Sequence, residues 1–344
     1  MTMLQGIAGG LRVAAASAAL SLGLSAAISA SAQDIPTKPE AGTFKLGLEP
    51  WLGYGQWQIA ATQNIYAKNG LEKVELVNFT QDKDIDAALA SGQIDGANIA
   101  THTAMAMAAA GLPIKIIMLE DFSLTADSII AGKDIHSIAD LRGKQVAFEQ
   151  GTTSDILLNY ALQANGMTIV DVQTVPMPAA DAGSALIAKR VPVAVTYEPY
   201  LTIARNQNKD VKLLYSAGED PGLVSDVFVV REEALTSKPG QILALVKSWD
   251  QALQYYKDHT KEGREIIAKS VGSSLADLET AFDGVRYYSL AENKQSLQGD
   301  FATKTFADVL QAAKKAGILT KDVSAAEMID PRFVAAALLR RRPG

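Results

Sequence analysis

Two similar loops hold most of the residues that could bind a ligand. The first, residues 49–57, follows an apolar strand and carries Trp51, Tyr54 and Trp57 before a helix begins. The second, residues 149–154, comes about one hundred residues later and again links a strand to a helix. Because ligands in open α/β sheets sit at the carboxyl ends of strands, we expect two facing half-sites. Core packing is the alternative role for each aromatic ring.

The polar residues of these and neighbouring loops favour two different kinds of ligand. Carboxylates beside aromatic rings are typical of sites for amines and other cations, whereas residues 151–154 open a helix whose N–H groups could hold an anion. Capping of that helix by a hydroxyl is the simpler explanation of the same residues. The predicted ligand-binding residues are Glu49, Trp51, Tyr54, Thr101, Asp121, Thr152, Thr153, Ser154, Tyr197, Glu198 and Asp226.

Basic residues are scarce in these loops, so we favour a small nitrogenous ligand with cationic or amine character. An anion held at residues 151–154 is the second hypothesis, and a zwitterion would use both ends of the site. Catalysis has little support, because the three histidines are scattered and no hydrolase or phosphate-loop motif is present. We predict no catalytic residue, no bound metal and no cofactor.

Strands that alternate with single helices predict an α/β fold with parallel sheets covered on both faces. The alternation runs through residues 44–119 and restarts at residue 128, with matched positions such as Glu49 and Glu149. This repetition predicts two similar doubly wound lobes joined by a two-strand hinge. Lobe I is expected at residues 44–125 plus 225–330 and lobe II at 126–224, after a loose leader at 33–43 and before a C-terminal tail at 331–344.

Residues 1–32 are typical of a cleavable signal peptide, because an Ala/Leu/Ser/Val run ends in Ala30-Ser31-Ala32. We therefore expect export, with cleavage after Ala32; an uncleaved membrane anchor is the alternative. The chain has no cysteine, hence no lipid on an N-terminal cysteine and no disulfide, which favours a Gram-negative periplasm. Its net charge of −6 argues against a nucleic-acid partner.

Several segments resemble the solute-binding proteins of ABC importers for nitrate, taurine and aliphatic sulfonates, which are related to those for thiamine pyrimidine precursors. The similar segments lie at residues 88–97, 121–127, 137–147, 151–154 and 197–200. One departure is Pro192-Val193, where similar proteins usually carry Asp-Ala. The resemblance implies a type II periplasmic binding fold that clamps a small solute between its lobes, works as a monomer and delivers the solute to an inner-membrane permease and ATPase.

Two other functions are compatible with the same fold. One is an enzyme like the eukaryotic pyrimidine synthases, which look to need cysteines and a histidine in the site; the lack of cysteine and the export signal count against it. The other is a ligand-sensing partner of a membrane receptor. The sequence does not separate sensing from transport, whereas neighbouring permease and ATPase genes would.

Overall fold

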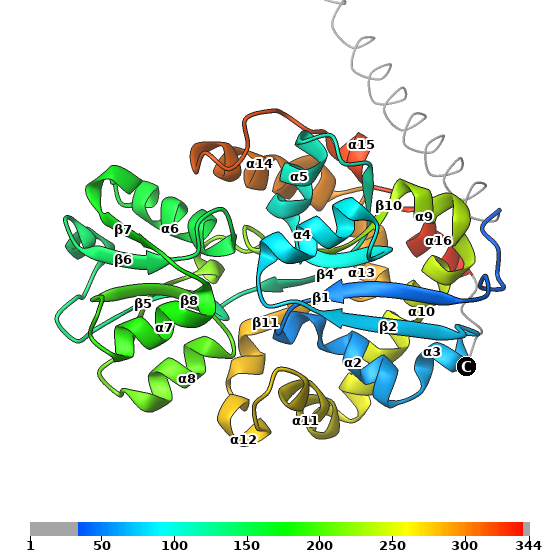
Figure 1. Cartoon of the computed structure of the whole chain (residues 1–344), viewed down its shortest axis with the longest axis horizontal. Coiled ribbons are helices and arrows are strands. Elements are labelled where there is room, and N and C mark those ends of the chain that lie inside the picture. Colours follow the sequence, from blue (N-terminus) through cyan, green and yellow to red (C-terminus); the bar gives the residue numbers. More distant parts are fainter. Residues whose placement is uncertain (1–33, 340–344) are drawn as a thin grey trace, which may run out of the picture.

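The computed structural model describes residues 34–339, except the side chain of Asp82, and forms two lobes, each built on one β-sheet (Figure 1). The predicted signal peptide lies outside the described residues. Lobe I holds a six-stranded sheet of order β11-β4-β10-β3-β1-β2, and lobe II a five-stranded sheet of order β7-β6-β8-β5-β9. The α/β class and the two-lobed architecture are those predicted from the sequence.

The strands of lobe I are β1 (Thr43–Leu48), β2 (Lys73–Asn78), β3 (Gly96–Ala100), β4 (Ile114–Ser123), β10 (Ser225–Arg231) and β11 (Val285–Tyr287). The strands of lobe II are β5 (Asp127–Ala131), β6 (Gln145–Phe148), β7 (Gln173–Pro176), β8 (Val193–Tyr197) and β9 (Lys212–Ser216). The strands of each lobe therefore form from segments in which apolar residues are consecutive or alternate with polar ones.

The helices of lobe I are α2 (Gly55–Thr62), α3 (Ile65–Lys68), α4 (Asp82–Ser91), α5 (Thr101–Ala109), α9 (Glu232–Ser237), α10 (Pro239–Asp258), α11 (Thr260–Ser270), α12 (Leu275–Leu278), α13 (Leu290–Ser296), α14 (Phe306–Lys315), α15 (Ala325–Met328) and α16 (Arg332–Leu339). Those of lobe II are α6 (Thr153–Ala164), α7 (Ala179–Ile187) and α8 (Tyr200–Gln207). In lobe II, α6 packs into one apolar cluster and α7 and α8 into another, so both faces of that sheet are covered.

The two sheets share one topology, but they are mixed, whereas the sequence predicted parallel sheets. The run β2-β1-β3-β10-β4 of lobe I corresponds to β7-β6-β8-β5-β9 of lobe II. In each run the first three strands are parallel and the fourth is antiparallel to both of its neighbours. The antiparallel strands, β5 and β10, are those by which the chain enters a lobe from the other one. Alternation of strands and helices does not reveal that reversal.

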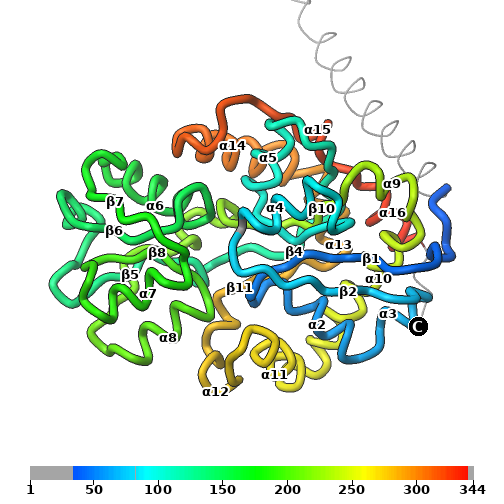
Figure 2. The backbone as a smooth tube through the Cα atoms, viewed as in Figure 1, coloured from blue at the N-terminus to red at the C-terminus, as the bar shows by residue number. Residues whose placement is uncertain are grey.

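The chain passes between the lobes at residues 124–126 and again at residues 217–224. The path of the backbone can be followed in Figure 2. The two crossings are hydrogen-bonded to each other. Ser123 N donates to Val224 O at 3.0 Å, and Gly218 N donates to Leu124 O at 2.5 Å. Paired crossings of this kind form a compact hinge.

The prediction of a C-terminal tail at residues 331–344 is wrong for residues 332–339. These residues form α16, whose Phe333 and Val334 are each only 1% exposed within the core of lobe I. The expected loose leader is also anchored, because the Glu40 carboxylate accepts the N–H groups of Gly240 and Gln241 at the start of α10. The sequence prediction gave too much weight to the terminal arginines, which lie outside the described residues.

Replacing Phe333 with alanine should lower the free energy of unfolding by about 3–5 kcal/mol, because a fully buried ring would leave a cavity. Denaturant titration of the purified protein measures this. Leu339 lies on the same helix but is 56% exposed, and is the matched control. Its replacement with alanine should change stability by no more than about 0.5 kcal/mol. Equal effects of the two substitutions would contradict the packing of α16.

Candidate ligand-binding site

A cleft between the lobes is the candidate site. Its empty volume, including the part open to solvent, is about 540 Å³. Both lobes contribute to it through the carboxyl ends of their parallel strands and through Asp127, Val224 and Asp226, which lie at or beside the two crossings. The lining residues are Glu49, Trp51, Tyr54, Ile85, Asn98, Ile99, Ala100, Thr103, Asp127, Thr152, Thr153, Tyr197, Val224 and Asp226.

Lobe I supplies an aromatic wall from the loop after β1. The Trp51 indole Nε1 donates to Asp121 Oδ1 at 3.2 Å, and the Tyr54 hydroxyl donates to Asp226 Oδ1 at 3.2 Å. Both rings are buried, and each polar tip is fixed by a carboxylate from a central strand of the sheet. Two rings held in this way form a rigid surface that costs a ligand little conformational entropy.

Lobe II supplies Tyr197, at the end of β8, and the residues that open α6. The Tyr197 ring meets the Trp51 ring edge to face, with centroids 5.8 Å apart and planes at 87°, so the aromatic surface continues across the cleft. Thr152 is the N-cap of α6, and its hydroxyl accepts Ser154 N at 3.3 Å. Asp155 Oδ2 accepts Gly151 N at 2.9 Å. The capping interpretation is therefore correct, and an acidic residue occupies the first turn of this helix.

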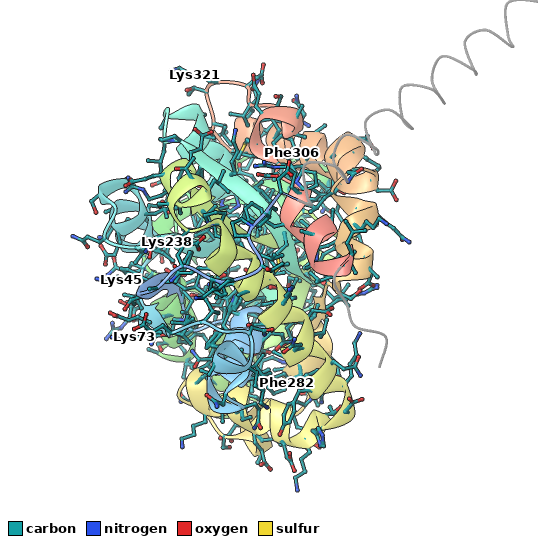
Figure 3. All side chains as sticks on the ribbon, turned by 90° about the vertical axis from the view of Figure 1, so that its right-hand side faces the viewer. Lys45, Lys73, Lys238, Phe282, Phe306 and Lys321 are labelled. Carbon is teal, nitrogen blue, oxygen red and sulfur yellow. The ribbon has the colours of Figure 1, made fainter. Side chains whose placement is uncertain are left out.

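The lining carries negative charge without positive charge. Glu49, Asp127 and Asp226 lie in it, and no lysine, arginine or histidine does. Basic side chains of lobe I are found elsewhere: Lys45, Lys73 and Lys238 are labelled in the view of the end of lobe I that faces away from lobe II (Figure 3). Two further acidic residues, Glu120 and Asp121, are adjacent on β4 and fully buried. An anion in the cleft would face an unbalanced negative field.

Burial and repulsion from neighbouring carboxylates raise the pKa of Asp121 and Asp127. For Asp127 burial is the main cause and the neighbouring Asp226 carboxylate the second, and together they raise its pKa to about 8. Burial first, then Asp226 and Glu120, raises the pKa of Asp121 well above its usual range. Carboxyls that share one dry site without a counter-ion favour protonation. A bound cation would reverse that preference.

Four of the eleven predicted site residues do not line the cleft and instead stabilise the loops that do. The hydroxyl of Thr101 bonds to Ser225, between α5 and β10. Ser154 is 2% exposed within the first turn of α6. Glu198 accepts both the N–H and the hydroxyl of Thr202, at 3.0 and 2.8 Å, at the start of α8. Asp121 lies behind Trp51. The other seven line the cleft.

The predicted ligand-binding residues leave out seven of the residues that line the cleft, although Ala100 and Thr103 lie in a loop that the sequence placed at the site: Ile85, Asn98, Ile99, Ala100, Thr103, Asp127 and Val224. Asp127 had a usable signal, because it lies at the expected crossing into lobe II and within a segment used for the resemblance. Val224 lies in the other crossing. The apolar lining residues could not be recognised from the sequence, because a strand end that lines a cleft has the same composition as one that enters the core.

His102, one of the three scattered histidines, does not line the cleft. It is 2% exposed on α5 and donates to the backbone of Gly151 in lobe II. Burial lowers its pKa to about 4, although the bond to Gly151 opposes this. The imidazole is therefore neutral at physiological pH and brings no positive charge to the site.

Gly53 allows the aromatic wall to form, because a Cβ on it would overlap both Asp121 Oδ2 and Trp51 Nε1. Gly53→Ala should displace the Trp51 ring and destabilise the protein by about 1–3 kcal/mol. Tryptophan emission and thermal melting measure the two effects. Gly132→Ala is the control, since its nearest neighbour would be 3.9 Å away. An unchanged emission spectrum for Gly53→Ala would contradict the geometry described here.

Within residues 34–339, no helix is long and apolar enough to cross a membrane, and no group of three or more metal-binding side chains is arranged around one point.

Known proteins resemble the chain across both lobes. A Brucella abortus (strain 2308) protein, named only as a binding protein, is 28% identical over 224 residues, which cover 64% of this chain and 69% of that protein. The taurine-binding periplasmic protein of Escherichia coli (strain K12) is 23% identical over 266 residues, covering 76% and 83% respectively.

The same fold occurs in the crystal structure of the periplasmic nitrate-binding protein NrtA from Synechocystis PCC 6803. The TM-score is 0.72 at 19% sequence identity, and the match covers 89% of this chain and 91% of that one. The family described as NMT1/THI5 like matches residues 56–263, more than half of the 344 residues and including parts of both lobes. The chain therefore belongs to the NMT1/THI5-like family and has the fold of type II periplasmic binding proteins.

Proposed function

We propose that this protein is the periplasmic solute-binding component of an ABC importer and that its solute is a small organic nitrogen compound carrying positive charge. The fold and the family support the first part. The lining of the cleft supports the second, because three carboxylates and three aromatic rings surround the space without one basic side chain. The solute is clamped between the lobes and delivered to an inner-membrane permease and its ATPase, with the protein acting as a monomer.

The proposed ligand class, a small organic cation, rests on the acidic residues that line the cleft. A cation placed there would gain attraction from Glu49, Asp127 and Asp226 while its apolar part packs on Trp51 and Tyr54. Because most of the side chains that line the site are buried, this attraction is stronger than it would be at an exposed surface. The fixed rings would also hold a flat ligand, such as an amidine or a protonated pyrimidine.

Anionic solutes such as alkylsulfonates or nitrate are the alternative, since relatives of this chain are named for taurine and nitrate. They would need N–H groups or basic side chains in the cleft. The start of α6 is the one candidate in the lining, but Asp155 and the Thr152 hydroxyl already accept the N–H groups of Gly151 and Ser154. The alternative is therefore the weaker of the two.

An enzyme on the same fold is the less favoured function. The pyrimidine synthases that the sequence resembles look to need cysteines and a histidine in the site. This chain has no cysteine, and His102 is buried outside the cleft lining with its pKa lowered to about 4. Binding and release of an unchanged solute agree better with these residues than chemical conversion does.

A thermal-shift screen of primary amines, amidines, pyrimidines, taurine, alkylsulfonates and nitrate tests the ligand class. A ligand at about a hundred times its dissociation constant should stabilise the protein by roughly 2.7 kcal/mol, and we expect only cationic compounds to do so. Asp226→Asn should abolish the shift, whereas Asp210→Asn, an exposed carboxylate of lobe II, should retain it. Stabilisation by nitrate or sulfonates alone would contradict the proposal.

The affinity for an amine should rise with pH up to about 8. The Asp127 carboxyl, with its pKa raised to about 8, must lose its proton to attract a cation, so affinity should fall roughly tenfold for each pH unit below that value. Calorimetry between pH 6 and 8.5 measures this, with an amine that stays protonated throughout. In Asp127→Asn the same range should give a flatter profile. A wild-type profile that falls with pH would contradict the role of Asp127.

A further inference from the structure

One lining residue has an unmet hydrogen-bonding capacity that the charge of the cleft does not explain. Asn98, on β3, is 1% exposed and lines the cleft. Its Nδ2 donates to Gly47 O on β1 at 2.8 Å, and this bond fixes which end of the amide is the oxygen. Oδ1 is buried and has no hydrogen-bond partner among the described residues. A strong acceptor is thus left without a donor at the wall of the site.

The position of Asn98 relates it to the carboxylates. In the antiparallel pairing of β3 with β10, Ala100 lies opposite Asp226, and Asn98 lies two residues from Ala100 on the same face of β3. Diagonal neighbours in such a pair have Cα atoms about 7–8 Å apart. A ligand that puts its charge against Asp226 can therefore present a second donor to Asn98 without being large.

We propose that Asn98 is a specificity-determining residue that selects ligands with N–H donors, namely primary ammonium, amidinium or guanidinium groups, over quaternary ammonium groups. This rests on the proposed cationic ligand. Carboxylates and aromatic faces alone would accept a quaternary ammonium, because cation–π attraction and charge do not require a hydrogen. Such a ligand leaves Oδ1 of Asn98 buried and unpaired, and sites with an unpaired polar group discriminate strongly.

The proposal is tested with a matched pair of probes, propylamine and propyltrimethylammonium, titrated by calorimetry into the full-length mature protein. We expect the wild type to bind the primary amine at least tenfold more tightly. Asn98→Leu, of similar size but without an acceptor, should reduce that ratio to near one by weakening the primary amine. Asn98→Ser, which keeps an oxygen, should restore part of the ratio. Asn206→Leu, at an exposed position on α8, should leave the ratio unchanged.

Three results would count against the proposal, and they are distinguishable. Equal binding of both probes to the wild type would overturn the role of Asn98 and leave the cationic ligand in place. An unchanged ratio in a folded Asn98→Leu variant, checked by circular dichroism and thermal melting, would do the same. Failure of the wild type to bind propylamine, propyltrimethylammonium and acetamidine would overturn the cationic ligand itself and the inference with it.

Discussion

The cost of burying several carboxyl groups close together governs this structure. Asp121, Asp127 and Asp226 meet where the two lobes join, and no basic side chain lines the cleft beside them. An ionised carboxylate in such a place loses hydration that its neighbours do not replace. Two features lower this cost. The raised pKa of Asp127 favours its protonated form, and the Trp51 N–H and the Tyr54 hydroxyl donate hydrogen bonds to Asp121 and Asp226. By our proposal, the ligand that binds beside these carboxyl groups is a cation.

The topology explains why these acids meet. Asp127 begins the strand that enters lobe II, and Asp226 lies near the start of the strand that returns to lobe I. Because each strand is the antiparallel member of its sheet, its first residues lie at the carboxyl ends of the parallel strands beside it. The hinge and the candidate binding site are therefore adjacent, and Val224 belongs to both. A charge placed between Asp127 and Asp226 acts directly on the two segments that join the lobes.

The sequence predicted more of the architecture than of the site. Strand periodicity and the repeat of residues 49–57 near 149–154 were enough to predict two like lobes, since both depend on local pattern. Strand direction was not predictable, because β5 and β10 read like any other apolar strand. Near the site, Thr101 and Glu198 are of residue types that often contact ligands, but their side chains form hydrogen bonds within the protein. Only their partners, Ser225 and Thr202, distinguish the two roles.

The same scaffold serves anions and, by our proposal, cations, because ligand charge is decided by a few loop residues and not by the sheets. In this chain the start of α6 is neutralised from within, where Asp155 accepts the N–H of Gly151. The partial positive charge of a helix N-terminus is thus already compensated before any ligand arrives. By our proposal, the three acidic residues in the lining then favour a cation over an anion. A protein at about 20% identity can share the fold without sharing the side chains of the cleft. The ligand must therefore be inferred from the residues of the site itself.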